Sequence, residues 1–344
     1  MNELRSLAEA AGYKVVNSTE QIRRPHPQFQ IGRGKAEELA KMVFDLDAEK
    51  VIFGNELKPV QSYNIAKLTG VEVIDRLQLI LEIFVRRAST MEAKLQIEMA
   101  RLQYELAHAK EKVRLAKMGE QPGFQGLGRY EVDVYYDAVQ RQVNSIRSKL
   151  KRIRKTRGLH RLHRRKLGFS SISLAGYTNS GKSTLFNSLT EEKVPVDAGM
   201  FTTLSTTTRA FDLFNFKILL TDTVGFIDRL PIPLIEAFRS TLEETIFSDL
   251  ILLVVDTSED QSEIKRKIFC CLDTIQEIGV AGISIITALN KIDLISDEDL
   301  EQKIEDLKGF SPNPVPISAL YRTNLDLIKE EISHHLKEAS LSLL

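Results

Sequence analysis

The sequence has few of the features that mark secreted, membrane-spanning or zinc-binding proteins. Its 344 residues include only two cysteines, Cys270 and Cys271, which are adjacent. Adjacent cysteines are poorly placed for a disulfide, and without a C-x-x-C pair there is no zinc framework. No apolar run approaches the ~20 residues needed to span a membrane. The start of the chain is polar, so we expect no secretory signal. We therefore expect a cytoplasmic protein without stable membrane insertion, with peripheral membrane association left open.

Acidic residues are missing from the middle of a chain whose net charge is zero. None lies between Asp137 and Glu191, and residues 147–166 carry 11 lysines and arginines. Residues 1–166 hold 32 Lys+Arg against 20 Asp+Glu, whereas residues 167–344 hold 15 against 27. A solvated helix face is the usual explanation of a charge run, but such faces mix signs and this one does not. A basic patch of one sign is typical of nucleic-acid binding, so we expect a phosphate-rich partner.

A complete phosphate-binding loop, G-x-x-x-x-G-K-S, occupies residues 176–183. Residues 171–175 before it predict a short buried strand, and residues 183–189 predict the start of a helix. Backbone N–H groups at such a helix N-terminus bind phosphate. Lys182 can reach the β and γ oxygens, and the Ser183 hydroxyl can bind Mg²⁺. A chance Gly-rich turn is the alternative, and the order of strand, loop and helix disfavours it.

Three apolar strands are predicted after this loop. Residues 216–222 end in Asp222, which can hold Mg²⁺ through water, and Gly225 can sense the γ-phosphate through its N–H. Residues 250–256 and 283–289 are further apolar strands. Such runs are typical of a mostly parallel sheet with helices on both faces.

A base-recognition motif follows the last of these strands. In Asn290-Lys-Ile-Asp293, the carboxylate of Asp293 can accept hydrogen bonds from the N1–H and 2-amino groups of guanine, which adenine does not present together. Residues 318–320, Ser-Ala-Leu, can offer a backbone N–H to the guanine carbonyl. In this order along the chain, the motifs predict a Mg²⁺-dependent GTPase that converts GTP to GDP and phosphate.

The segment before the GTPase motifs predicts a small α/β domain at residues 1–86. Short strands are expected at residues 13–17, 50–53 and 71–74. Residues 32–35, Gly-Arg-Gly-Lys, open a helix but lack the spacing and the hydroxyl of a second phosphate-binding loop. A Gly-rich turn before a helix is therefore the preferred interpretation.

A helical hairpin is predicted between this domain and the GTPase domain. Apolar residues recur at spacings of four and three on both sides of the Gly-rich segment 119–128. This pattern predicts an antiparallel coiled coil extending ~40 Å, with a pair of helices packed on the first domain as the alternative. The predicted domains are residues 1–86 (small α/β), 87–167 (hairpin and basic linker) and 168–344 (P-loop GTPase).

These motifs resemble the HflX GTPases, within the Obg–HflX branch of translation-associated GTPases. In the N-terminal half, similar strings lie at residues 32–35, 54–57, 73–77, 79–84 and 87–96. Phe201–Arg209 resembles the family's switch I, and Asp222–Ile227 its switch II. Two departures are visible: the family's Gly-rich hairpin segment is reduced at residues 122–129, and Ser205-Thr206 stands where Asp-Pro is usual.

The resemblance implies site residues and a partner. Thr203 would be the switch I threonine that binds Mg²⁺, and Thr207 is a competing candidate. The implied partner is the large ribosomal subunit or its RNA, bound by a monomer of this chain.

Residue 226 is Phe, where Ras-type enzymes have the Gln that orients the attacking water. Intrinsic hydrolysis should therefore be slow and accelerated by another group or by a partner. We predict a ribosome-associated GTPase switch. The alternatives are an RNA-binding or chaperone module whose hydrolysis is incidental, and a signalling GTPase with a protein target.

The candidate site residues fall into three sets. We expect Lys182, Thr203 and Gly225 to act in catalysis, and Ser183 and Thr203 to bind Mg²⁺. The expected GTP- or GDP-binding residues are Gly176, Tyr177, Thr178, Asn179, Ser180, Gly181, Lys182, Ser183, Thr184, Phe201, Thr202, Thr203, Leu204, Ser205, Asp222, Thr223, Val224, Gly225, Asn290, Lys291, Ile292, Asp293, Ser318, Ala319 and Leu320.

Overall fold

The computed structural model describes residues 2–118, 127–191, 201, 206–214, 216–228, 231, 234, 245–279 and 282–341. The chain forms two compact units: unit 1 is Met1–Arg86 with Lys94–Leu150, and unit 2 is Arg87–Ala93 with Lys151–Leu344. No helix in the described part of the chain combines the length and apolar content that crossing a membrane requires.

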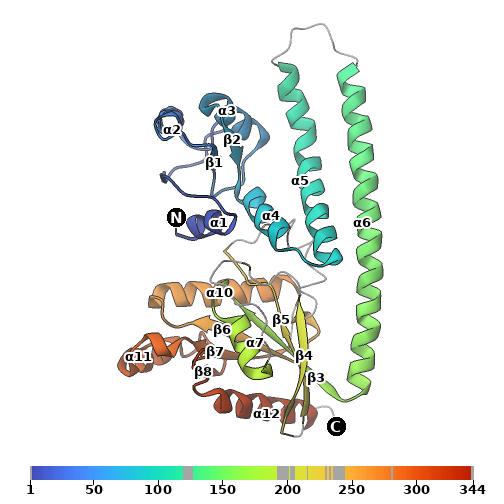
Figure 1. Ribbon diagram of the computed structural model, residues 1–344, viewed down its shortest axis with the longest axis vertical. Helices are drawn as coiled ribbons and strands as arrows, with labels where there is room; N and C mark the ends of the chain where they lie inside the picture. The colour runs from blue at the N-terminus through green and yellow to red at the C-terminus, as the bar shows by residue number, and fades with distance from the viewer. Residues whose placement is uncertain are drawn as a thin grey trace. The chain divides into compact units, whose positions relative to one another are not determined.

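Unit 1 contains a two-stranded parallel sheet. β1 (Lys50–Ile52) pairs with β2 (Glu72–Ile74), and α3 (Pro59–Thr69) connects them, because parallel strands need a crossover. The other helices that precede α5 in the chain are α1 (Asn2–Ala10), α2 (Arg33–Asp45) and α4 (Arg76–Arg87) (Figure 1). A hydrophobic cluster joins strands and helices through Val43, Val51, Leu57, Ile65 and Val73. α2 begins directly after Gly32, as expected for a turn that opens a helix.

The strand predicted at residues 13–17 is wrong. This segment is described and has no strand assigned, whereas the other two predicted strands are confirmed as β1 and β2. The segment is held by side chains instead: the Tyr13 hydroxyl donates to Glu82 Oε2 at 2.5 Å and accepts from Lys50 Nζ at 2.7 Å. Tyr13 and Val15 are half-buried, but partial burial carries no information on whether a strand finds a partner.

Two long helices follow in the chain. α5 (Met91–Met118) and α6 (Leu127–Lys166) run antiparallel, and the parts of them that belong to unit 1, between Lys94 and Leu150, lie side by side (Figure 1). The Tyr135 hydroxyl on α6 donates to Glu105 Oε2 on α5 at 3.2 Å. Both helices bury apolar side chains, among them Ile97, Met99, Val139, Val143 and Ile146. The coiled-coil packing stays a prediction, and most of the Gly-rich segment 119–128 lies outside the described residues.

A buried carboxylate joins α4, α5 and the segment before α3. Asp75 is 1% exposed; its Oδ1 accepts from the Gln78 N–H at 3.0 Å, which caps α4. Its Oδ2 accepts from the Leu57 N–H at 3.2 Å and the Tyr104 hydroxyl at 3.1 Å. Burial and the Asp75 charge raise the pKa of Tyr104 above its usual range, so the phenol stays a donor.

Unit 2 is built on a six-stranded sheet in the order β4-β5-β3-β6-β7-β8. Only β4 is antiparallel to its neighbour. The strands are β3 (Phe169–Gly176), β4 (Thr207–Leu213), β5 (Phe216–Asp222), β6 (Leu250–Asp256), β7 (Ser284–Asn290) and β8 (Pro314–Pro316). The helical elements after β3 that have described bounds are α7 (Lys182–Thr190), α10 (Gln261–Glu277), η1 (Ile292–Leu294), α11 (Asp297–Leu307) and α12 (Leu325–Leu341).

Helices cover both faces of this sheet, which explains the apolar runs in its strands. On β6, Leu250, Leu252 and Val254 pack in a cluster with α7 and α12, while Ile251 and Leu253 pack in a cluster with α10. Side chains alternate between the faces of a strand, so a strand buried on both faces must be apolar throughout. The predicted mostly parallel α/β fold is confirmed.

The strand order predicts a ligand-binding site at the carboxyl end of β3. β3 lies between β5 and β6, and the chain winds outward from it in both directions. In open α/β sheets, ligands bind outside the carboxyl ends of the strands at such a switch point. Residues 177–181 connect β3 to α7, so the fold puts the predicted phosphate-binding loop there.

We expect Asp75→Ala to destabilise unit 1 by about 3 kcal/mol. The substitution removes a helix cap and leaves the buried Tyr104 hydroxyl without its acceptor. Hydrogen exchange of the α4 amides should accelerate accordingly. Tyr104→Phe, which removes one of the three hydrogen bonds, should cost about 1 kcal/mol. Equal exchange in the parent protein and Asp75→Ala would contradict this role for the carboxylate.

Candidate nucleotide-binding site

The loop between β3 and α7 has a backbone path that requires its two glycines. Gly176 and Gly181 have φ of 150° and 94°. A Cβ on Gly176 would lie 2.3 Å from the Val254 carbonyl oxygen, and one on Gly181 would lie 2.2 Å from Asn290 Nδ2. Both distances are impossible, so any side chain here would displace the loop from its neighbours.

Polar groups inside the loop are arranged for an anionic ligand. The Lys182 ammonium is buried and donates to the Tyr177 carbonyl oxygen at 2.7 Å. Burial lowers the pKa of Lys182, and the nearby Asp222 carboxylate opposes that change. The hydroxyl oxygens of Thr178 and Ser180 are buried and have no hydrogen-bond partner among the described residues. A phosphate would satisfy both the charge and the hydroxyls.

The N-terminus of α7 brings a hydroxyl and a carboxylate together. The Ser183 Oγ donates to Asp222 Oδ2 at 2.7 Å, and Asp222 is fully buried at the end of β5. Oxygen ligands of this kind suit Mg²⁺, which binds through few protein groups together with water and phosphate. These residues therefore fit the predicted metal.

The switch I prediction falls mostly outside the described residues. The switch I residues outside the described part of the chain are Thr202, Thr203, Leu204 and Ser205. Phe201 is described and is 2% exposed, with φ of 57°. Thr207 begins β4, opposite Asp222 in the strand register. The choice between Thr203 and Thr207 as a metal ligand stays open.

Residues 222–226 lie directly against the phosphate-binding loop. The Thr178 N–H donates to the Phe226 carbonyl at 2.8 Å, and the Phe226 N–H donates to the Gly176 carbonyl at 3.0 Å. A Cβ on Gly225 would lie 2.8 Å from Thr178 Cγ2 and 3.1 Å from Lys182 Nζ. Gly225 and Lys182, the two groups predicted to contact the γ-phosphate, are therefore brought together.

The base-recognition residues are joined to the loop by one amide. Asn290, 2% exposed, donates from Nδ2 to the Ser180 carbonyl at 2.9 Å. Its Oδ1 accepts from the Ala319 N–H at 2.9 Å. Asp293 lies in η1, where its Oδ1 accepts from the Ser318 Oγ at 2.5 Å. The structure thus gathers both halves of the predicted base site.

Two site features were missed from the sequence. Asp256, at the end of β6, forms an ion pair with Lys291 at 2.5 Å and accepts a hydrogen bond from the Ser258 hydroxyl at 2.6 Å. It lies opposite Asn290 in the register of β6 and β7. The rule that ligands bind beyond the carboxyl ends of the strands could have found it.

The second missed feature is the position of Phe226. Its side chain is 2% exposed and packs in the cluster that contains Tyr177, Ile251 and Leu253. Phe226 therefore contributes its backbone to the site and its ring to the core.

Comparisons with known proteins agree with this site. Residues 1–85, 87–164 and 171–291 match the family models described as GTP-binding GTPase N-terminal, GTP-binding GTPase Middle Region and 50S ribosome-binding GTPase. The GTPase HflX of Methanocaldococcus jannaschii is 49% identical over 98% of this chain and 83% of its own length. The chain belongs to the HflX GTPase family. The predicted family and the predicted class, a GTP-binding GTPase, are both confirmed.

Other HflX proteins and two crystal structures are similar along most of the chain. The HflX of Thermococcus kodakarensis is 48% identical over 88% of this chain and 68% of its own length. A GTP-binding protein from Sulfolobus solfataricus in complex with GDP has 32% identity and a TM-score of 0.51, over 98% of this chain and 96% of that one. The SsGBP and GDP complex has 33% identity and a TM-score of 0.54, over 98% and 95% of the two chains.

We expect Asp293→Asn to change the base preference of this HflX protein. The substitution replaces an acceptor by a donor, which mismatches guanine and suits the 2-oxo group of xanthine. Affinity for GTP should fall by roughly 3 kcal/mol, and xanthosine triphosphate should become the preferred ligand in competition binding. The Asn Oδ1 can still accept from Ser318, so the fold should persist.

Asp297→Asn, an exposed charge change on α11, is the matched control and should leave the guanine preference intact. Unchanged discrimination between the two triphosphates in Asp293→Asn would mean that the base binds elsewhere.

We expect Lys182→Ala to lower triphosphate affinity by about 100-fold, because it removes a buried charge-assisted contact. Titration with a fluorescent GTP analogue would measure this loss. Phe226→Leu keeps an apolar side chain in the core and should bind within about threefold of the parent, since the ring offers no phosphate ligand. An equal loss in both variants would show that the assigned roles are wrong.

Proposed function

We propose that this GTPase is a nucleotide-controlled switch that acts on the large ribosomal subunit, and that the candidate site binds GTP in one defined orientation. The phosphates would lie in the loop at residues 176–183, where Lys182 supplies positive charge. The guanine would lie between Asp293 and the backbone of Ala319. The support for this orientation is that the Asn290 amide connects the two ends.

Mg²⁺ would be held by Ser183, with Asp222 acting through water and Thr203 as the expected switch I ligand. When bound, it would neutralise charge on the β- and γ-phosphate oxygens. The chain's own contribution is positional. Lys182 and the Gly225 N–H would place the γ-phosphate, and the buried surroundings would exclude water other than the attacking one.

Slow intrinsic hydrolysis follows from the position of Phe226. Its ring packs in the core and has no group that could orient a water molecule. Catalysis would then depend on positioning and charge alone, and a further group from elsewhere would raise the rate. The ribosome is the proposed source of that group.

The proposed RNA contact is the basic end of α6. Lys151, Arg152 and Lys155 are exposed there. Other basic side chains of this segment are held within unit 2: Arg157 forms an ion pair with Glu92 at 2.6 Å, and the Arg161 guanidinium lies 4.1 Å from the Phe247 ring centroid. The segment therefore combines anchored cations with a row of exposed ones, as a rigid phosphate-binding surface would.

Family membership supports ribosomal RNA as the source of these phosphates, because the model matched by residues 171–291 describes a 50S ribosome-binding GTPase. An RNA-binding module with incidental hydrolysis is the second candidate, favoured by the same basic surface. GTP turnover distinguishes them: purified large subunits should raise it if the chain is a switch. Nucleotide-dependent RNA binding without a change in turnover would favour the module.

We expect the triple variant Lys151→Glu, Arg152→Glu, Lys155→Glu to bind large subunits more weakly and with a flatter salt dependence. Each lost phosphate contact reduces the log–log slope by about 0.7 to 0.9. Guanine-nucleotide affinity should be unchanged, because none of these residues lies in the candidate site.

The matched control reverses three exposed lysines elsewhere, Lys41, Lys67 and Lys337, and alters net charge equally. Ribosome affinity that falls equally in both variants would refute a specific role for the α6 segment. Unchanged affinity in the α6 variant would refute the RNA contact itself.

A further inference from the structure

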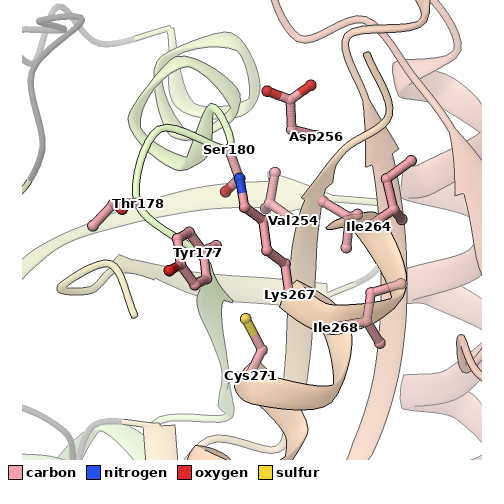
Figure 2. A pocket seen from close by; sticks show the side chains of 10 residues that line it. Tyr177, Thr178, Ser180, Val254, Asp256, Ile264, Lys267, Ile268 and Cys271 are labelled. Carbon is pink, nitrogen blue, oxygen red and sulfur yellow. The ribbon is translucent and has the colours of Figure 1, made fainter. Parts of the chain in front are cut away.

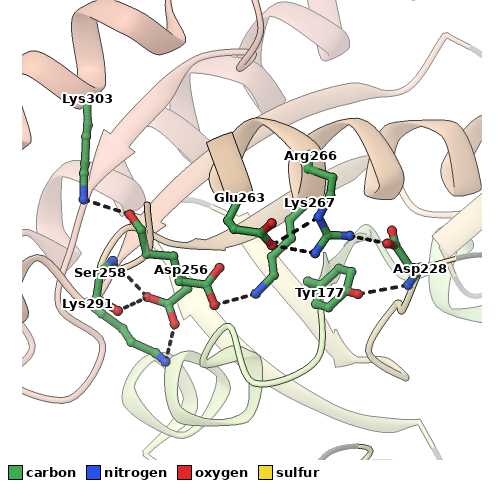
Figure 3. Close-up of polar contacts among 10 residues, drawn as sticks. Tyr177, Asp228, Asp256, Ser258, Glu263, Arg266, Lys267, Lys291 and Lys303 are labelled. Carbon is green, nitrogen blue, oxygen red and sulfur yellow. Dashed lines mark hydrogen bonds and ion pairs between the residues drawn. The ribbon is translucent and has the colours of Figure 1, made fainter. Parts of the chain in front are cut away.

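A layer of side chains connects the phosphate-binding loop, the segment after Gly225 and helix α10. At its centre is Tyr177, the second residue of the loop, which is 5% exposed. Its hydroxyl accepts a hydrogen bond from the Asp228 backbone N–H at 3.0 Å. The same aspartate forms an ion pair through its carboxylate with Arg266 on α10 (Figure 3).

Arg266 is itself held in place. Its Nε and Nη2 donate to Glu263 Oε2 at 3.1 and 2.8 Å, and its guanidinium carbon lies 5.6 Å from the centroid of the Tyr177 ring. Hydrogen bonding to Glu263 and Tyr177 and the charge of Asp228 raise the pKa of Arg266, against the effect of burial. The guanidinium is therefore a permanent cation with a fixed orientation.

The Tyr177 ring has polar neighbours besides its apolar packing partners. A small pocket lies between the loop and α10, lined in part by Tyr177, Lys267 and Cys271 (Figure 2). Lys267 Nζ lies 4.8 Å from the ring centroid and pairs with Glu259 at 2.5 Å. The ring thus has polar and cationic partners on the α10 side, and a backbone N–H from Asp228 at its hydroxyl.

These contacts continue a backbone connection. Phe226 exchanges hydrogen bonds with the loop on both sides of Tyr177, at 2.8 and 3.0 Å. Gly225, immediately before it, is placed beside Lys182 Nζ. Any displacement of Asp228 would be transmitted through two residues to the Gly225 N–H, which is expected to meet the γ-phosphate.

We propose that Tyr177 and Arg266 are positioning residues for GTP hydrolysis. Through Asp228 they hold the segment after Gly225 against the loop, so that Gly225 and Lys182 contact the same γ-phosphate. This inference rests on the proposed orientation of GTP in the site. GDP has no γ-phosphate, so its affinity does not depend on this arrangement. A contact that raises the population of the arrangement in which Gly225 and Lys182 lie together increases the affinity only of ligands that carry a γ-phosphate.

The test compares GDP, a non-hydrolysable GTP analogue and GTP turnover in the full-length protein. Tyr177→Phe keeps the ring and loses the acceptor, while Arg266→Met keeps most of the side-chain length and loses the charge. Both should raise the dissociation constant of the GTP analogue and lower kcat by about three- to tenfold, the effect of one hydrogen bond or one half-exposed ion pair. In Arg266→Met, which lies outside the candidate nucleotide-binding residues, affinity for GDP should stay within about twofold.

Lys267→Met is the matched control, since this lysine lies over the same ring on the same helix and pairs with Glu259 rather than Asp228. Its GTP-analogue affinity and kcat should stay within about twofold of the parent. The double variant Arg266→Met, Asp228→Asn should be no worse than either single variant, because both remove the same ion pair.

Three results would overturn the proposal. Equal losses of GDP and GTP-analogue affinity would indicate a merely structural role. Tighter GTP-analogue binding would mean that the contacts hold the segment in an inactive position, and unchanged kcat would mean that they do not affect the reaction. An error in the proposed orientation of GTP would give a different result. In that case Lys182→Ala would keep its affinity for GDP and for the GTP analogue, and its GTP turnover.

Discussion

The side-chain amide of Asn290 is the interaction on which the nucleotide site depends. It donates to the Ser180 carbonyl in the phosphate-binding loop and accepts from the Ala319 N–H in the base-recognition segment. Ser180 lies 110 residues and Ala319 29 residues from Asn290 in the chain, so one buried side chain holds two distant loops together. The amide can approach only because Gly181 has no Cβ, which would lie 2.2 Å from its nitrogen. The glycine of the first motif and the asparagine of the second are therefore one structural unit, and a change in either would alter the distance between the phosphate and base ends.

The sheet makes this arrangement possible by collecting polar residues at the carboxyl ends of otherwise apolar strands. Asp222, Asp256 and Asn290 end β5, β6 and β7. Each is preceded by residues that pack against helices, so polar groups are confined to the carboxyl ends of the strands, where ligands bind in open α/β sheets. Lys291 adopts a left-handed conformation directly after β7, with φ of 69°, and its ammonium is paired with Asp256. Packing on both faces of the sheet thus determines where the strands lie, and the strand ends determine the positions of the polar groups.

The motifs, the parallel sheet and most strands could be predicted because each depends on local spacing or on residue type. A phosphate-binding loop can be predicted because its glycines and lysine lie within eight consecutive residues, and β6 can be predicted because every residue in it before Asp256 is apolar. The failed strand at residues 13–17 shows the limit, because periodicity describes burial but a strand also needs an unpaired edge to join. The contacts of Arg266 with Asp228 and Tyr177 could not be predicted, since they link residues 38 positions or more apart whose types are common on any surface. The structure of the switch I segment at residues 202–205 stays a prediction.

The core position of Phe226 constrains how this enzyme can be controlled. A glutamine there would place an amide where the cluster with Ile251 and Leu253 now excludes water, at the cost of burying an unsatisfied polar group. The chain thus uses position 226 for core packing and for two backbone hydrogen bonds to the loop, and under the proposed function water positioning would come from another group. In the proposed orientation of GTP, Lys182 and the Gly225 N–H would stabilise charge and orientation but would activate no nucleophile. Control of the rate must then act on how firmly these two groups are held together or on the arrival of the missing group.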